Sequence, residues 1–203
     1  MMERIKIVYI DDSPDNDLSR FLDKVNQHFD DQEYEFESED IIFETTQSYE
    51  SLLQDTRVRT ANIIVIDSRL FEDRAEALGR FTGEEFKIVL QKFYPYIKVI
   101  VVTQNEADPQ IRIIPKYGKS GSETGTDYYT RVMLPHIKGA IQDIMIYRTL
   151  ANKMNENSSW EAVLKEKVLG TLQGTQAYDT LTKEDIDNLI GAFREIGKMV
   201  NGG

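Results

Sequence analysis

Hydrophobic and polar positions follow two periodicities along the first 150 residues of the chain. Short runs rich in Ile and Val predict strands, whereas apolar residues three and four positions apart predict helices. The expected strands are residues 5–10, 34–46, 62–66, 97–102 and 110–115, and the expected helices are residues 15–29, 48–55, 83–93 and 127–154. Alternating strands and helices are typical of a parallel sheet with crossover helices. We therefore predict an α/β fold with five parallel strands.

Three features interrupt this regular alternation. Residues 37–40 (ESED) are acidic, and they predict a turn or hairpin within the second strand region. Only residues 104–109 separate the fourth and fifth strands, too few for a full crossover helix. Pro135 predicts either a first-turn residue or a kink in the last helix. The fourth helix of the fold is thus expected to be shortened or missing.

The C-terminal part of the chain differs from the rest. Ser158 with Glu161, and Thr182 with Asp185, resemble capping pairs and predict the starts of two amphipathic helices. Two helices of this size cannot enclose a core of their own. We therefore divide the chain into an α/β domain (1–150) and a helical extension (151–203). The extension would pack on the domain, on a partner or on a second copy, which allows a homodimer.

Charge and composition narrow the classes of partner. The 203 residues carry a net charge of −11, whereas nonspecific binding to nucleic acid or anionic membrane needs a basic face. The C-terminal extension has more acidic than basic residues, so we expect no DNA-recognition helix. There is no cysteine, no signal-peptide core and no apolar run of membrane-spanning length. These observations predict a cytoplasmic protein whose partners are proteins and include neither nucleic acid nor membrane.

Polar side chains stand where four of the five predicted strands end. Asp11 and Asp12 follow the first strand, Asp67 the third, Thr103 the fourth and Lys116 the fifth. Ligands of doubly wound sheets bind outside the carboxyl ends of the strands. Clustered carboxylates suit Mg²⁺, and one carboxylate of such a cluster can attack a phosphoryl group. An ammonium and a hydroxyl would balance the charge on the phosphoryl oxygens.

These residues and their surroundings resemble the receiver domain of two-component response regulators. The matching motifs are IVYIDD (7–12), IIVID (63–67), FTGEEF (81–86), VIVVT (99–103) and IIPK (113–116). The resemblance covers about residues 1–148. It implies a flavodoxin-like, doubly wound parallel sheet with the strand order 2-1-3-4-5.

The resemblance also implies a role for each strand-end residue. Asp67 would be the phosphoacceptor. Asp11, Asp12 and Asp67 would hold Mg²⁺, with the backbone carbonyl of Arg69 as a further ligand. Lys116 would bind the phosphoryl group; Lys119 competes for this role, and we favour Lys116 because it ends the strand.

Several positions depart from the family pattern. Thr103 would be the switch hydroxyl, but Gln104 follows it where receivers usually have a small residue. Pro115 precedes Lys116, whereas receivers usually have the lysine before the proline. The usual aromatic switch position, three residues before the lysine, is Ile113. We therefore expect the site chemistry to be retained and the usual output of the family to be altered.

Three functions are weighed on these grounds. The leading one is a phosphoacceptor response regulator in a phosphorelay. It would be phosphorylated on Asp67 by a histidine kinase or phosphotransfer protein, would act through protein–protein interaction, and would not be a turnover enzyme. The alternative is a pseudo-receiver that serves as a scaffold without phosphorylation. A Mg²⁺-dependent phosphatase with Asp11 as nucleophile is disfavoured because it needs an acid at position 13, where the chain has Ser13.

Overall fold

The computed structural model describes residues 2–29, 33–44, 47–70, 82–104, 113–118 and 122–156. Its strands are β1 (Glu3–Asp11), β2 (Tyr34–Ile42), β3 (Ile63–Asp67), β4 (Lys98–Thr103) and β5 (Ile113–Pro115). Its helices are α1 (Asn16–Asp23), a 3₁₀ turn (Val25–His28), α2 (Tyr49–Gln54), α3 (Thr56–Arg59), α4 (Gly83–Phe93), α5 (Gly125–Val132) and α6 (Leu134–Glu156).

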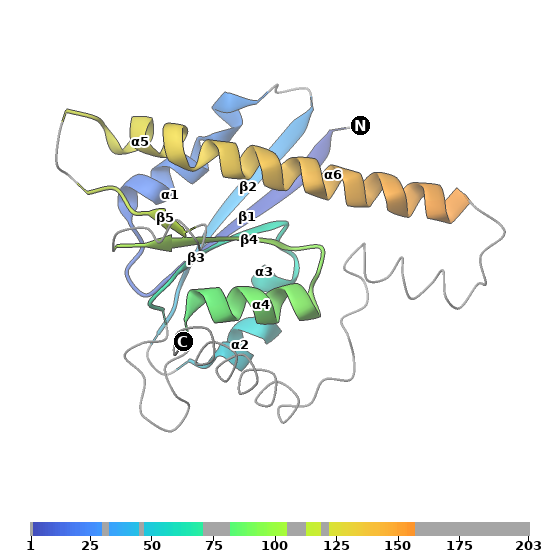
Figure 1. Ribbon diagram of the computed structural model, residues 1–203, viewed down its shortest axis with the longest axis horizontal. Coiled ribbons are helices and arrows are strands. Elements are labelled where there is room, and N and C mark those ends of the chain that lie inside the picture. The colour runs from blue at the N-terminus through green and yellow to red at the C-terminus, as the bar shows by residue number, and fades with distance from the viewer. Residues whose placement is uncertain are drawn as a thin grey trace, which may run out of the picture.

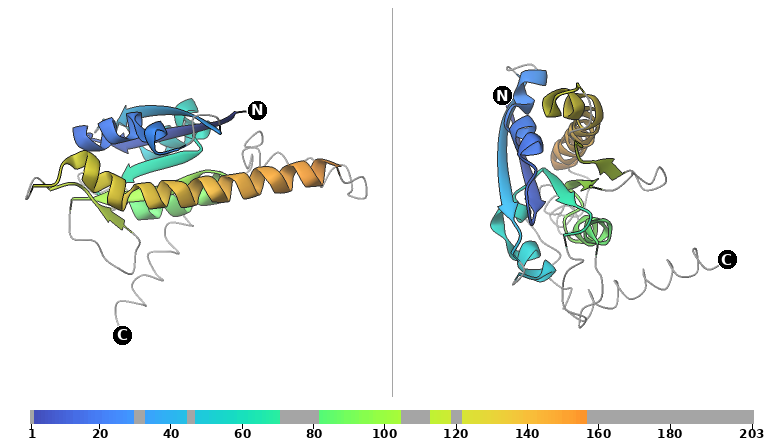
Figure 2. Two further views of the ribbon diagram at one scale, coloured as in Figure 1. Left: turned by 90° about the horizontal axis from the view of Figure 1, so that it is seen from above. Right: turned by 90° about the vertical axis from the view of Figure 1, so that its left-hand side faces the viewer.

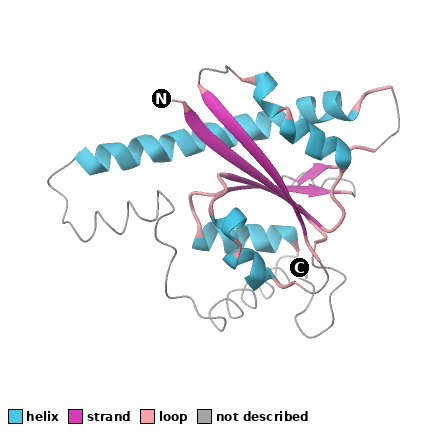
Figure 3. Ribbon diagram, turned by 180° about the vertical axis from the view of Figure 1, so that it is seen from behind, coloured by secondary structure: helices cyan, strands magenta, loops and turns pink. Residues whose placement is uncertain are grey.

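The strands form one parallel sheet in the order β2-β1-β3-β4-β5. β3 is buried at every position, as expected for a central strand that is covered on both faces. The predicted doubly wound α/β fold and its strand order are therefore confirmed. Figure 3 shows the sheet between its helical layers.

Helices cover both faces of the sheet (Figure 1). Helices α1, α5 and α6 lie on one face, and α2, α3 and α4 lie on the other. Successive residues of β1 point to opposite faces, so Tyr9 is buried in the core under α1, α5 and α6, while Ile10 is buried in the core under α2 and α4. Helix α6 continues past the end of the sheet (Figure 2). None of the described helices is both long and apolar enough to span a membrane.

Polar side chains at the helix starts explain several element boundaries. Asp15 caps α1, Ser48 caps α2 and Asp55 caps α3, each by accepting a hydrogen bond from a backbone N–H of the first turn. Thr82 caps α4 and forms a capping box with Glu85. These caps satisfy N–H groups that have no partner within the helix.

Two predicted elements differ from the structure. The acidic residues 37–40 form no turn, because β2 runs unbroken through them and pairs with β1 over its whole length. Lys6 of β1 explains this difference: its ammonium lies 3.8 Å from Glu37 and 3.1 Å from Glu39, which stabilises acidic side chains along the strand. The expected helix over 15–29 ends at Asp23, and a 3₁₀ turn follows it.

The end of the α/β domain contains two helices rather than one. α5 ends at Val132, and α6 begins at Leu134, so Pro135 stands in the first turn of α6. Its missing N–H costs nothing there, and the expectation of a first-turn proline is confirmed. Residues 105–112, where the fourth helix would lie, and residues 157–203 of the predicted extension are outside the described residues. The boundary between the two predicted domains stays a prediction.

Candidate functional site

The carboxylates of Asp11 and Asp67 meet the ammonium of Lys116 at the carboxyl ends of the strands. β1 and β3 are neighbours in the sheet, so their terminal aspartates lie close together. Lys116 Nζ lies 2.6 Å from Asp11 Oδ2 and 2.7 Å from Asp67 Oδ1. All three side chains are buried: Lys116 is 5% exposed, Asp11 1% and Asp67 8%. The structure therefore places one lysine between two buried carboxylates.

Lys116 reaches this position because β5 is in register with β4. Pro115 pairs with Thr103, and the backbone N–H of Lys116 donates to the Thr103 carbonyl at 2.6 Å. Burial alone would lower the pKa of Lys116, but the hydrogen bonds to and the charges of Asp11 and Asp67 outweigh it and raise the pKa. The ammonium is thus charged at neutral pH. Lys119 lies outside the described residues.

Three donors hold the Asp11 carboxylate in place. Its Oδ1 accepts a hydrogen bond from the backbone N–H of Ser13 at 3.0 Å. Its Oδ2 accepts hydrogen bonds from Lys116 and from the phenol of Tyr9. Burial, followed by the negative charge of Asp11 and the hydrogen bond to it, raises the pKa of Tyr9 far above the ordinary value for a phenol. Tyr9 therefore remains a neutral hydrogen-bond donor.

Asp67 is fixed by the chain that follows β3. Its Oδ2 accepts a hydrogen bond from the backbone N–H of Arg69 at 2.8 Å, while Oδ1 faces Lys116. The first turn of α4 approaches closely here, because the N–H of Gly83 donates to the Ser68 carbonyl at 2.8 Å. A Cβ at Gly83 would collide with the backbone oxygen of Asp67. Gly83 is thus the residue that lets α4 begin beside the predicted phosphoacceptor.

Thr103 lies where predicted, as the last residue of β4, and it is 4% exposed. The next residue, Gln104, is exposed. The Thr103 carbonyl accepts the hydrogen bond from the backbone N–H of Lys116, so the two residues are neighbours across β4 and β5. The structure therefore brings Asp11, Asp67, Thr103 and Lys116 to one end of the sheet.

Asp12 lies just beyond β1 and is exposed. Burial, then the hydrogen bond with and the charge of Asp11, then the charge of Asp67, raise the pKa of the Asp12 carboxyl. Lys116 acts in the opposite direction, since its positive charge lowers the pKa of Asp12.

The donor chemistry of this site fits Mg²⁺. Among the residues that the structure describes, no three His, Cys, Asp or Glu side chains are grouped closely enough to hold a metal. The cation between Asp11 and Asp67 is instead the ammonium of Lys116. Asp11, Asp12 and Asp67 nevertheless offer carboxylate oxygens at the same end of the sheet, and oxygen is the ligand type that Mg²⁺ prefers.

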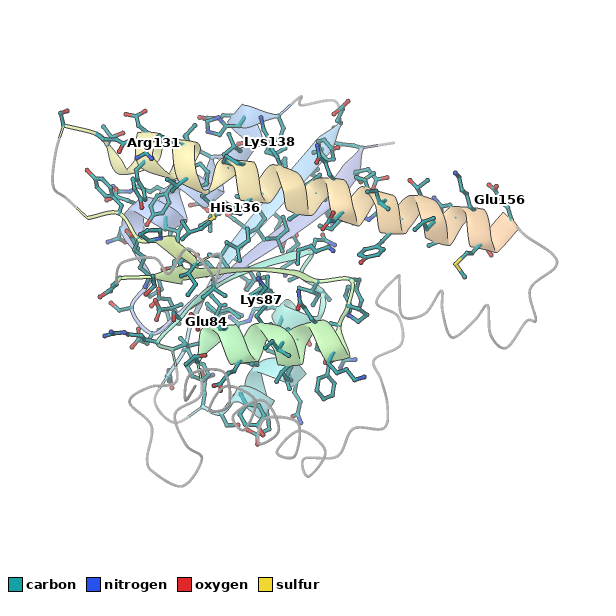
Figure 4. The ribbon with its side chains drawn as sticks, viewed as in Figure 1. Glu84, Lys87, Arg131, His136, Lys138 and Glu156 are labelled. Carbon is teal, nitrogen blue, oxygen red and sulfur yellow. The ribbon has the colours of Figure 1, made fainter. Side chains whose placement is uncertain are left out.

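Glu84 is an acidic side chain that the sequence did not single out. Figure 4 shows it at the end of α4 that carries Gly83. Its Oε1 accepts a hydrogen bond from the Ser68 hydroxyl at 2.8 Å, while its Oε2 is buried and has no hydrogen-bond partner among the residues that the structure describes. Glu84 therefore adds negative charge on the α4 side of Asp67.

Sequence reasoning also missed the buried tyrosines behind the site. Tyr9 is fully buried and contacts Asp11, and Tyr129 of α5 is fully buried and donates to Asp15 Oδ2 at 2.7 Å. A usable signal was present, since residues two apart on a strand share a face and Tyr9 stands two residues before Asp11. The apolar pattern around Tyr9 made it indistinguishable from an ordinary core residue.

Comparisons with known proteins find similarity among solved structures only. No protein-family model matches the sequence, and no curated protein matches it. Similar solved structures include the isolated receiver domain of RcsB from Salmonella enterica serovar Typhimurium with the phosphomimetic BeF3⁻ (17% identity, 70% of this chain and 90% of that chain, TM-score 0.40). The same protein bound to the promoter rprA gives 14% identity, covers 92% of this chain and 99% of that chain, and has a TM-score of 0.37.

A third structure, of a complex between the two-component response regulator RcsB and DNA, has 14% identity and a TM-score of 0.39, and the match covers 93% of this chain and 98% of that chain. The strand order that the resemblance to receiver domains implies is the order of the sheet itself, β2-β1-β3-β4-β5. The exclusion of nucleic acid from the partners is contradicted, because two of the similar chains are bound to DNA. The physical reason is that net charge is an average over the chain and leaves local surfaces undetermined.

Proposed function

We propose that this chain is a phosphoacceptor of the response-regulator type, in which Asp67 takes up a phosphoryl group with the help of Mg²⁺. The observation that carries the proposal is the buried Lys116 ammonium between Asp11 and Asp67, at 2.6 and 2.7 Å. Perturbed and closely coupled charges of this kind are typical of functional sites. Their position at the carboxyl ends of parallel strands is where doubly wound sheets bind ligands.

Asp67 would act as the nucleophile. Its Oδ1 and Oδ2 are held by Lys116 and by the N–H of Arg69, so the carboxylate has a fixed orientation. A carboxylate oxygen would form the new bond to phosphorus while the bond from phosphorus to the donor's leaving atom breaks. The donor would be the phosphohistidine of a histidine kinase or phosphotransfer protein, whose imidazole takes a proton as it leaves.

The other residues would bind and orient the phosphoryl group. Asp11, Asp12 and Asp67, with the backbone carbonyl of Arg69, would hold Mg²⁺, which neutralises charge on the phosphoryl oxygens when it is bound. Lys116 would exchange its contact with Asp67 Oδ1 for one with a phosphoryl oxygen. Its backbone hydrogen bond to Thr103 would carry this movement to β4.

One observation favours a second candidate, a pseudo-receiver that is never phosphorylated. Lys116 already pairs with both Asp11 and Asp67, so these two carboxylates have a cationic partner without metal. The exposed Gln104 beside Thr103 would also narrow the approach to Asp67 in a way that the usual small residue does not. In this case the site would stabilise the fold of a scaffold protein.

Phosphorylation with a small-molecule donor separates the two candidates. The protein is incubated with Mg²⁺ and acetyl phosphate, and the mass of the intact chain is measured. The phosphoacceptor proposal predicts the addition of one phosphoryl group that is stable in acid and lost in base. Asp67→Asn should abolish the addition, because the amide cannot attack.

Asp40→Asn is the matched control. Asp40 is an aspartate of β2 whose side chain accepts a hydrogen bond from the Ser19 hydroxyl on the protein surface, while its backbone stands beside Tyr9 in the β1–β2 pairing. It should be modified to the same extent as the unchanged protein. Failure of the unchanged protein to gain mass, while Mg²⁺ stabilises it, would favour the scaffold.

A further inference from the structure

Two buried tyrosines join the predicted metal ligand Asp11 to helix α5 through hydrogen bonds. The Tyr9 phenol donates to Asp11 Oδ2 and accepts from the backbone N–H of Asp15 at 3.2 Å. The Tyr129 phenol donates to Asp15 Oδ2 at 2.7 Å and accepts from the backbone N–H of Tyr117 at 3.0 Å. Each phenol thus donates one hydrogen bond and accepts one. Along the path from Tyr117 to Asp11, each hydrogen bond is donated by the group farther from Asp11.

The path closes on itself at the site. Tyr117 directly follows Lys116, whose ammonium donates to Asp11 Oδ2 at 2.6 Å, the oxygen that also accepts from Tyr9. We call the closed path through Asp11, Tyr9, Asp15, Tyr129, Tyr117 and Lys116 the Tyr9–Tyr129 circuit. Hydrogen bonds that polarise one another in a buried network are stronger than isolated ones.

The circuit gives the two oxygens of the Asp11 carboxylate different partners. Oδ2 accepts from Tyr9 and Lys116, whereas Oδ1 accepts only the Ser13 N–H among the hydrogen bonds given above. Free rotation of the carboxylate would exchange the two oxygens and break these bonds. The circuit therefore holds Oδ1 as the oxygen with remaining capacity for a cation.

We propose that Tyr9 and Tyr129 are positioning residues for the Asp11 carboxylate, so that cation binding at Asp11 depends on the packing of α5. The inference rests on the proposed function, because it takes Asp11 as a ligand of Mg²⁺. Hydrogen-bonding partners behind a metal ligand orient it, and their loss typically weakens metal binding by about 10- to 100-fold. The hydrogen bonds of Tyr129 go to Asp15 and Tyr117, so its effect on Mg²⁺ would pass through Asp15 and Tyr9 or through Tyr117 and Lys116.

The test is a Mg²⁺ titration of the full chain by NMR, using the amide signals of Ser13 and Arg69. These two N–H groups donate to Asp11 Oδ1 and Asp67 Oδ2, so they report on the two carboxylates separately. Tyr9→Phe removes one oxygen and leaves the ring in the core. We expect it to weaken Mg²⁺ binding by about 10-fold.

Tyr129→Phe should weaken Mg²⁺ binding by a smaller factor, and the loss in the double variant should be smaller than the product of the two single losses. Non-additivity of this kind is expected when one residue acts through the other. Asp15→Asn breaks the same path at another residue. The side-chain oxygen of the asparagine can still cap α1, but its NH₂ group cannot accept the hydrogen bond from the Tyr129 hydroxyl. It should resemble Tyr129→Phe.

Tyr94→Phe is the control for a purely structural effect. The Tyr94 side chain is buried on the opposite face, and its hydroxyl donates to the Leu53 carbonyl at 2.8 Å, far from the site in the fold. It should lower the free energy of unfolding as the other variants do and leave Mg²⁺ affinity unchanged. Equal Mg²⁺ affinity in all three phenylalanine variants would overturn the inference alone.

Asp11→Asn distinguishes failure of the inference from failure of the proposed function. If the unchanged protein binds no Mg²⁺, or if Asp11→Asn binds it equally well, both the proposed function and the inference are wrong. If Asp11→Asn loses binding while Tyr9→Phe and Tyr129→Phe keep it, only the circuit is wrong.

Discussion

At the scale of single residues, the positive charge of Lys116 compensates the negative charges of the site. Removing one partner of a buried ion pair leaves the remaining charge without compensation, which costs far more than the pair itself contributes. Here one ammonium serves two buried carboxylates, Asp11 and Asp67. Its loss would leave two such charges.

We predict that Lys116→Met lowers the free energy of unfolding by about 3–5 kcal/mol, the range observed when a buried pair is broken. The measurement is urea unfolding without divalent cations. Added Mg²⁺ should recover part of the loss, because it would compensate the same carboxylates.

Arg4→Met is a matched control on the surface. Arg4 lies 3.5 Å from Glu35, and both side chains are more than half exposed, so water screens the pair. Its removal should hardly change the urea midpoint. Equal midpoints for Lys116→Met and Arg4→Met would contradict the buried character of the Lys116 contacts.

At the scale of helices and strands, Gly83 allows the first turn of α4 to lie against the end of β3. An added Cβ would meet the Asp67 backbone oxygen and would lie 3.0 Å from Ser68 Cα, and backbone cannot move aside as a flexible side chain can. We predict that Gly83→Ala lowers the free energy of unfolding by about 1–3 kcal/mol, as overpacking does. It should also shift the Asp67 and Ser68 NMR signals.

Gly139→Ala makes the same chemical change within α6, where no atom of the described residues outside the adjacent helix backbone lies within 4 Å of the added Cβ. Alanine is a better helix former than glycine, so this variant should be more stable than the unchanged protein by about 0.5–1 kcal/mol. Thermal unfolding of both variants measures the contrast. A stabilising Gly83→Ala would show that α4 does not abut Asp67 as described.

Helix α3 is only four residues long, and its start depends on Asp55. The carboxylate accepts from the Arg57 backbone N–H at 2.8 Å and pairs with the Arg57 guanidinium at 2.6 Å. The hydrogen bond from the Arg57 side chain is the largest influence, and it lowers the pKa of Asp55 below its usual 3.8. The charged form is therefore the one that the folded state favours.

The sign of the resulting pH dependence follows from the lowered pKa. Asp55 contributes stability above its unfolded pKa and loses it as the pH falls through the lower folded value. Asp55→Asn keeps an oxygen for the cap but has no charge. We predict that the unchanged protein is more stable than Asp55→Asn at neutral pH, by less than about 1 kcal/mol because the pair is partly exposed. Urea unfolding should show this difference vanish in acid; a difference independent of pH would contradict the assignment.

The sequence predicts a helix or strand well where the hydrophobic pattern reflects burial. It predicts poorly where an element or a residue's role depends on contacts with residues elsewhere in the fold. β3 was predictable because it is covered on both faces, and Asp67 because it ends that strand. The acidic stretch of β2 was mispredicted because its stability comes from Lys6 on another strand, a contact that local propensity does not contain. Tyr9 was missed for a similar reason, since its partners Asp11 and Asp15 come together only in the fold.

The site and the fold are thermodynamically linked at the scale of the whole molecule. A cation that binds the folded chain and not the unfolded one stabilises the fold by an amount that grows with its concentration. The folded chain brings the buried carboxylates of Asp11 and Asp67 together at the ends of β1 and β3. Mg²⁺ should therefore raise the unfolding temperature through these residues.

We predict that Mg²⁺ at about 100 times its dissociation constant stabilises the protein by about 2.7 kcal/mol. Asp11→Asn and Asp67→Asn should each lose most of this gain, because each removes a charged oxygen ligand. Asp143→Asn is the control, since Asp143 is 58% exposed on α6 and pairs with Lys98 at 3.2 Å. Thermal unfolding with and without Mg²⁺ measures all four proteins. An equal Mg²⁺ effect in Asp11→Asn and Asp143→Asn would mean that the cation stabilises the molecule elsewhere, and the ends of β1 and β3 would then have no part in binding it.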